Sequence, residues 1–160
     1  MDKKKLVYDK LTDMNIPFQA VEHAAVFTIE EMQMLDFPPK SRIAKNLFLR
    51  DAKGKRHFLV VVDAEHEVNL KQLETVLNCT KLSFASKERL QTHLGLAKGA
   101  VSPFGLLNDT ANHVEFYLDK KLREGDTIGI HPNDNTATVF ITFDDLLKFI
   151  GAIGHPVQLF

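Results

Sequence analysis

The segment from Lys98 to Leu106 has the residue types of a loop that could hold a reacting group. Gly99 and Gly105 permit positive φ angles and bring no side chain to block a ligand from the backbone. Pro103 fixes its own φ angle and pushes Ser102 toward extended geometry, so the loop is shaped rather than flexible. Free backbone N–H groups in such a loop can hold a carbonyl oxygen, a carboxylate or a polarised water. Taken alone, the segment is more simply explained as a tight connection between a helix and a strand.

Polar side chains at three other places are candidates for the same site. Lys45 and Asn46 interrupt the apolar run Ile43–Leu49, and a lysine there must point to solvent or reach into a cleft, because unpartnered burial is costly. Solvated lysines are common on strands, whereas in a cleft the ammonium would bind a phosphate or a ribose edge. His131 lies where a predicted strand meets a turn, although its ring could simply cap a backbone group. His23, near the end of an early extended segment, is the third candidate.

Several kinds of chemistry find no support in the sequence. There is no phosphate-binding glycine loop, no dinucleotide fingerprint and no nucleophile-elbow serine. Cys79 has no evident base beside it, which favours a half-buried structural thiol over a nucleophile. The remaining histidines, at positions 57, 66, 93, 113 and 155, match no metal-ligand spacing. We therefore expect neither a metal nor a cofactor.

The composition is that of one globular domain covering residues 1–160. Hydrophobic residues make up 44% and charged residues 26%, which argues against disorder. With 20 basic and 21 acidic residues the formal net charge is −1, so any contact with nucleic acid has to be local. The single cysteine suits a reducing compartment. The N-terminus lacks a secretory pattern and no segment has the length of a membrane span, so we expect a soluble, cytoplasmic protein without membrane contact.

The elements that must position these residues follow from periodicity and from capping patterns. Helices are predicted over residues 2–14, 28–35, 69–77, 86–94 and 142–150, and Thr28, Asn69, Ser86 and Thr142 begin the last four. Strands are predicted over residues 18–22, 43–50, 56–62, 81–85, 114–118, 127–131, 136–141 and 157–160, with a polar turn over 119–125. Hairpins with interspersed short helices indicate an α+β fold with a mixed, largely antiparallel sheet flanked by short helices.

Four stretches of this chain, in order and spacing, resemble the YbaK-like family, the free-standing relatives of the editing domain of bacterial prolyl-tRNA synthetases. The stretches are Ile43–Leu49, Phe84–Leu96, Gly99–Pro103 and Ile130–Asn133, and the resemblance covers nearly the whole chain. It implies the YbaK fold and the hydrolysis of tRNA mischarged by prolyl-tRNA synthetase. The Lys45-Asn46 pair is most similar to the branch that deacylates alanyl-tRNA(Pro), and the cysteinyl-tRNA(Pro) branch is the nearest alternative.

The resemblance also implies roles for individual residues. Lys45 would hold the terminal adenosine or its phosphate, and Asn46 would orient the aminoacyl group or the ribose. The resemblance further implies that a free ribose hydroxyl of the substrate helps to activate the water, and we expect backbone N–H groups of the Gly99–Pro103 loop, with Gly99, Ala100 and Val101 as the catalytic residues, to bind the substrate carbonyl or the water. Further substrate contacts are expected from Ser102, Pro103, His131 and His23. The expected partner is the acceptor end of tRNA(Pro), with prolyl-tRNA synthetase as a possible second one. A synthetase-associated binding module that has lost activity is the alternative outside the enzymes.

Overall fold

The computed structural model describes residues 2–35 and 37–160. Its α-helices are α1 (Lys3–Asp13), α2 (Ile29–Gln33), α3 (Leu70–Leu77), α4 (Lys87–Leu94) and α5 (Phe143–Ala152). Two 3-10 helices are η1 (Pro103–Asn108) and η2 (Lys120–Glu124). The strands are β1 (Gln19–Glu22), β2 (Ser41–Arg50), β3 (His57–Asp63), β4 (Ser83–Phe84), β5 (Val114–Leu118), β6 (Thr127–Ile130), β7 (Ala137–Ile141) and β8 (Gln158–Leu159). None of the described helices is long and apolar enough to cross a membrane.

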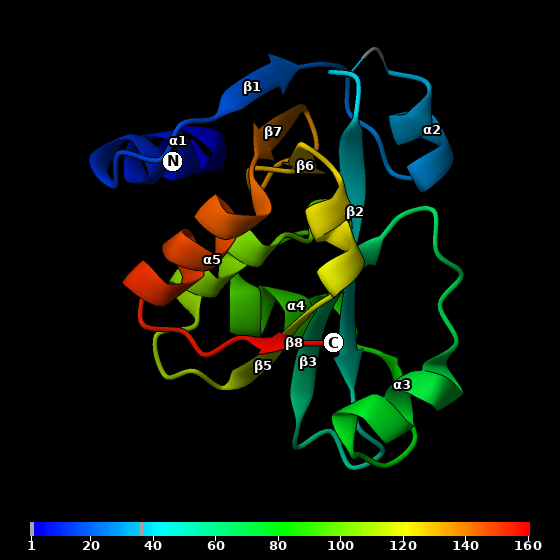
Figure 1. Ribbon diagram of the computed structural model, residues 1–160. Coiled ribbons are helices and arrows are strands. Elements are labelled where there is room, and N and C mark those ends of the chain that lie inside the picture. Colours follow the sequence, from blue (N-terminus) through cyan, green and yellow to red (C-terminus); the bar gives the residue numbers. More distant parts are fainter. Residues whose placement is uncertain (1, 36) are drawn as a thin grey trace.

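The strands form a mixed sheet in the order β1-β7-β6-β2-β3-β5-β8, with β4 beside β2. Four of the strand pairs are antiparallel and three are parallel, which confirms the predicted fold class. The long strand β2 joins the two halves of the sheet (Figure 1). Its first residues, Ser41–Ile43, pair in parallel with β6, and the following residues, Ala44–Arg50, pair antiparallel with β3. The chain therefore changes sheet neighbour within a single strand.

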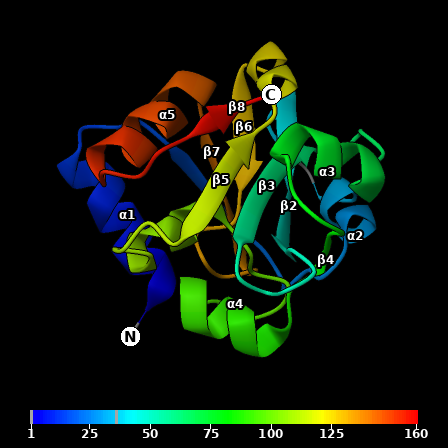
Figure 2. The same cartoon turned by 90° about the horizontal axis from the view of Figure 1, so that it is seen from below.

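Strand β3 is buried along its whole length because both faces of the sheet are covered there. Leu59 and Val61 belong to the larger core, which α1, α4 and α5 also enter. Phe58 and Val60, on the opposite face, belong to a smaller core closed by α3. Figure 2 shows α3 on one side of the β2–β3 pair and α1 and α5 on the other. This arrangement explains why the strand is a continuous apolar run instead of an alternating one.

The predicted helix starts are confirmed by their capping contacts. The side chains of Thr28, Asn69, Ser86 and Thr142 each accept a hydrogen bond from the backbone N–H three residues later. At α2 the reciprocal contact differs in detail, because the Glu31 carboxylate accepts from the backbone N–H of Phe27 at 3.3 Å. The cap of α2 thus also holds the backbone of Phe27.

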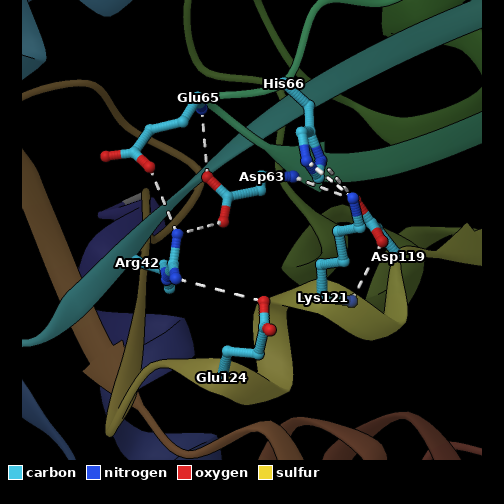
Figure 3. Close-up of polar contacts among 7 residues, drawn as sticks. All are labelled: Arg42, Asp63, Glu65, His66, Asp119, Lys121 and Glu124. Atoms are coloured by element: carbon cyan, nitrogen blue, oxygen red, sulfur yellow. Dashed lines mark hydrogen bonds and ion pairs between the residues drawn. The ribbon is translucent and has the colours of Figure 1, made fainter.

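The segment predicted as a polar turn over residues 119–125 contains the 3-10 helix η2, and a polar network anchors it to the sheet. Figure 3 shows the members of this network: Arg42, Asp63, Glu65, His66, Asp119, Lys121 and Glu124. The Arg42 guanidinium lies 3.1 Å from the Asp63 carboxylate, whose side chain is only 3% exposed. Asp119 caps η2 by accepting from the backbone N–H of Lys121. These contacts anchor η2 to the start of β2 and to the end of β3.

Candidate active site

A cavity opens where the sheet divides. The last pair of β2 with β6 is Ile43 opposite Gly129, and β4 joins β2 only at Leu49 opposite Phe84. Between these points the described strands offer β2 a neighbour on one side alone, which is β3. A cavity of about 760 Å³ lies along this stretch. That volume is in the range of about 300–1,000 Å³ typical of small-molecule sites.

The cavity wall is basic and largely apolar. Its described lining residues are Val26, Phe27, Thr28, Ile29, Met32, Ala44, Lys45, Asn46, Leu47, Phe48, Phe84, Ala85, Lys87, Leu90, Lys98, Gly99, Val101, Gly129 and His131. Three lysines and no aspartate or glutamate occur among them. The chain as a whole is close to neutral, whereas the described lining carries a local excess of positive charge. An anionic ligand is the chemistry that such a wall favours.

Lys45 and Asn46 both lie on the open stretch of β2 and line the cavity. Both residues are half-buried. The Lys45 ammonium makes no ion pair with any described residue. The Oδ1 atom of Asn46 is buried and has no hydrogen-bond partner among the described residues. An unpaired buried carbonyl costs about 1–3 kcal/mol, and a ligand with an N–H or O–H donor would remove that cost.

Of the five site residues predicted in the loop Gly99–Pro103, two line the cavity. Gly99 and Val101 line it, and their backbone N–H groups donate to no acceptor in the part of the chain that the structure describes. Ala100 differs, because its N–H donates to the Ala97 carbonyl at 3.1 Å. Ser102 and Pro103 are buried outside the cavity lining, where they begin η1. The structure therefore places Gly99 and Val101 in the same cavity as Lys45. The other three predicted residues, Ala100, Ser102 and Pro103, are outside its lining.

Gly99 is required at its position for two reasons. Its φ angle is +90°, a conformation that other residues rarely adopt. A Cβ atom built there would lie 2.9 Å from Cδ1 of Phe27, closer than carbon atoms pack. The missing side chain thus lets Phe27 pack directly against the loop backbone.

The two predicted histidines occupy different places. His131 lines the cavity, and its Nδ1 atom lies 2.8 Å from the Ala137 carbonyl oxygen. Burial lowers the pKa of His131, so the ring is neutral near pH 7 and carries its proton on Nδ1, which leaves a lone pair on Nε2. His23 is outside the lining; its Nε2 bonds the Thr138 hydroxyl at 2.8 Å and its ring lies 6.1 Å from that of His131. His23 therefore packs behind His131.

Sequence reasoning missed two aromatic residues on the cavity wall. Phe27 is 68% exposed and Phe84 is 62% exposed, although both line the cavity. Exposed phenylalanines at the edge of a basic cavity are suited to stacking on planar ligands. Phe27 directly precedes the capping residue Thr28, and Phe84 precedes the helix that Ser86 caps. Their neighbours signalled helix starts, but nothing in the local sequence signals exposure.

Two further expectations from the sequence concern the five remaining histidines and Cys79. The five remaining histidines match no metal-ligand spacing in the sequence, yet one ring nitrogen from each of His57, His93 and His113 lies within 4.8 Å of the other two. They come from segments far apart in the sequence, which ligand spacing cannot detect. Burial raises the pKa of the Cys79 thiol, and this residue lies outside the cavity lining, in contact with the smaller core.

The chain matches the family described as "Aminoacyl-tRNA editing domain" over residues 23–149. It is 49% identical to the prolyl-tRNA editing protein ProX of Acetoanaerobium sticklandii, covering 99% of this chain and 96% of that protein. It is 36% identical to prolyl-tRNA synthetase associated domain-containing protein 1 of Mus musculus, covering 94% and 91%. A solved structure of a candidate trans-editing enzyme for prolyl-tRNA synthetase has the same fold, with a TM-score of 0.74 at 21% identity over 99% and 96% of the two chains. The chain thus belongs to the aminoacyl-tRNA editing domain family.

Proposed function

We propose that this protein is a trans-editing deacylase that hydrolyses the ester of mischarged tRNA(Pro), with alanyl-tRNA(Pro) as its preferred substrate. The observation that carries the proposal is the buried oxygen of Asn46, unpaired among the described residues, in a cavity whose described lining has three lysines and no carboxylate. An aminoacylated 3′ end combines an ammonium donor with phosphates, and this cavity offers a partner to each. Membership of the editing family and the near full-length similarity to ProX support the same conclusion.

The reaction needs no protein nucleophile, because the aminoacyl ester is already activated. A water oxygen bonds to the carbonyl carbon, and the free ribose hydroxyl of the substrate accepts one of the water's protons while passing its own proton to the neighbouring ester oxygen. The resulting oxyanion accepts hydrogen bonds from the N–H groups of Gly99 and Val101, which have no acceptor among the described residues. Ala100 is left out of this role, since its N–H is held by Ala97. The C–O bond to the ribose then breaks, and the ribose oxygen leaves with a proton.

The side chains of the wall bind and orient the substrate. Lys45 holds the terminal phosphate or the edge of the terminal ribose, as the only cation on the open stretch of β2 among the described residues. Asn46 Oδ1 accepts from the α-ammonium of the amino acid, which satisfies its buried oxygen. The neutral ring of His131 accepts a hydrogen bond at Nε2 from the terminal nucleoside.

The single-stranded acceptor end occupies the edge of the cavity. Phe27 and Phe84 stack on its bases, and Lys87 and Lys98 lie beside its phosphates. Stacking of a base on an aromatic ring contributes about 1–3 kcal/mol and does not depend on the base identity. A second cavity of about 380 Å³ shares Phe27 and Lys98 with the first, so the strand has room to continue.

Selection of the amino acid rests on size. A synthetase site shaped for proline cannot strongly reject a smaller side chain, because each missing methylene is worth only about 1–3 kcal/mol. A second site too small for proline supplies the missing discrimination, since packed walls resist added volume. Alanine is therefore admitted and proline excluded.

The decisive experiment compares deacylation of alanyl-, cysteinyl- and prolyl-tRNA(Pro) by the purified protein under one set of conditions. We expect fast cleavage of the alanyl ester and almost none of the prolyl ester. Comparable rates on alanyl- and prolyl-tRNA(Pro) would rule out an editing role, because the enzyme would destroy the correct product. Faster cleavage of the cysteinyl ester would assign that substrate and leave the mechanism intact. Adding prolyl-tRNA synthetase to the same assay tests whether it delivers the substrate.

A further inference from the structure

Three histidines from separate parts of the chain meet beside the sheet, away from the cavity lining. His57 begins β3, His93 lies in the last turn of α4, and His113 precedes β5. One ring nitrogen from each lies within 4.8 Å of the other two. His57 is buried, His93 is half-buried and His113 is exposed. One side of the cluster is therefore closed by protein and the other is open to solvent.

The hydrogen bonds of His57 determine where its proton lies. Arg89 can only donate, so the contact of its Nη1 with His57 Nε2 at 3.0 Å makes Nε2 an acceptor. The proton of the neutral ring is then on Nδ1, which lies 3.1 Å from Nε2 of His113. Because Nε2 accepts the bond from Arg89 and carries no proton, the His57 ring is neutral, and burial lowers its pKa in the same direction. Two imidazole nitrogens thus face each other across one proton.

We propose that His57, His93 and His113 form a binding site for a divalent transition-metal ion of the zinc class. Imidazole nitrogens are ligands that Zn²⁺, Co²⁺ and Ni²⁺ accept, and the solvent side leaves the fourth position to water. With bonds of about 2.0–2.1 Å in tetrahedral geometry, ligand nitrogens lie about 3.4 Å apart. The 3.1 Å separation between His57 Nδ1 and His113 Nε2 is already close to that value. His93 and His113 are accessible enough for their rings, now stacked at 4.5 Å, to turn.

The ion takes the place of the proton between the two rings. It bonds Nδ1 of His57 and Nε2 of His113, and the displaced proton moves to Nε2 of His57. Arg89 then has to release that nitrogen, and it keeps its second contact, from Nη1 to the Gly54 carbonyl at 3.1 Å. The positive charge of the guanidinium opposes the ion, whereas the carboxylates of Asp51 and Asp109 lie near enough to favour it. Asp109 also accepts from the backbone N–H of His113 at 3.0 Å and so fixes the start of that ligand.

The site is structural, because none of the three histidines lines the cavity. An ion there ties α4 to β3 and to the segment before β5. Phe48 stacks on His57 with ring centroids 5.8 Å apart and lines the cavity on its other side, and Leu90 of α4 lines the cavity too. Binding therefore stabilises the wall that these two residues form. The proposal does not depend on the substrate of the cavity.

The test is a titration of the full chain, first stripped of metal with a chelator, with Co²⁺ in the absence of tRNA. We expect visible absorption bands of tetrahedral cobalt that saturate at one ion per chain, and a higher melting temperature with Zn²⁺. His93→Ala and His113→Ala, at the more accessible positions, should abolish the bands, and the control His66→Ala should keep them. Arg89→Gln should bind cobalt at least as tightly as the unchanged chain. Absence of the bands, or their survival in both His93→Ala and His113→Ala, would overturn the proposal.

Discussion

Replacing Asn46 by leucine tests two effects of this residue separately: its unfavourable contribution to folding stability and its favourable contribution to substrate binding. The Oδ1 atom is buried without a partner among the described residues, so the folded protein carries about 1–3 kcal/mol of unrecovered desolvation. Leucine has a similar shape and no polar atom, so Asn46→Leu should raise the melting temperature. For a chain of 160 residues, about 1 kcal/mol corresponds to about 2–4 °C.

The same substitution should reduce catalysis. A hydrogen bond to a charged group is worth about 1.5–3 kcal/mol, and the α-ammonium of the substrate is such a group. At about 1.4 kcal/mol per factor of ten, kcat/KM for alanyl-tRNA(Pro) should fall about 10- to 150-fold. The control is Gln19→Leu, which replaces an exposed amide on β1 outside the cavity lining and should leave kcat/KM unchanged. Full activity in a folded Asn46→Leu protein, or a melting temperature lowered by several degrees, would refute the reasoning.

Further substitutions test the other parts of the wall. Lys45→Ala should remove most deacylation at an unchanged melting temperature, because this lysine is half-buried and makes no ion pair with a described residue; unchanged turnover would eliminate its role. Gly99→Ala should lower stability by about 1–2 kcal/mol and reduce kcat, because the positive φ angle and the 2.9 Å approach of Phe27 leave no room for a Cβ atom; thermal melting and kinetics measure both effects. Phe84→Ala should raise KM about 5- to 150-fold through the lost base stack, whereas Phe84→Trp should retain activity; equal KM values for all three proteins would exclude stacking. Cys79→Ser should remain active, since burial raises the pKa of this thiol away from the cavity, and an inactive folded variant would bring back a covalent mechanism.

The local parts of the fold were predictable from the sequence because their causes are local. Thr28, Asn69, Ser86 and Thr142 begin helices through contacts that span three residues. The β2–β3 hairpin follows from two apolar runs and a turn containing Gly54. The parallel pairing of β2 with β6 could not be predicted in this way, because Ser41 and Thr127 are brought together only by the folded chain.

The same limit applies to the candidate site. Lys45, Gly99 and His131 could be selected from the sequence because each departs from the residues around it. The exclusion of Ser102 and Pro103 from the cavity depends on η1, whose first turn buries them. His57, His93 and His113 have no spacing signal at all, since their proximity is a property of the tertiary packing. Functional residues that stand out from their neighbours in the sequence can therefore be predicted, whereas those brought together only by tertiary packing cannot.

Both buried unpaired side-chain oxygens of the described residues lie at the two adjoining cavities. Asn46 has a buried unpaired oxygen, Gly99 has a positive φ angle, and Phe27 and Phe84 are exposed, and all four line the same cavity. The other buried unpaired side-chain oxygen among the described residues, Oδ1 of Asn133, lines the adjoining cavity. A ligand site can hold such unpaired groups, because the ligand supplies the missing hydrogen-bond partners. If the cavity binds the acceptor end, alanyl-tRNA(Pro) or an uncleavable analogue should raise the melting temperature of the unchanged chain more than that of Asn46→Leu, since only the former recovers the cost of its buried oxygen.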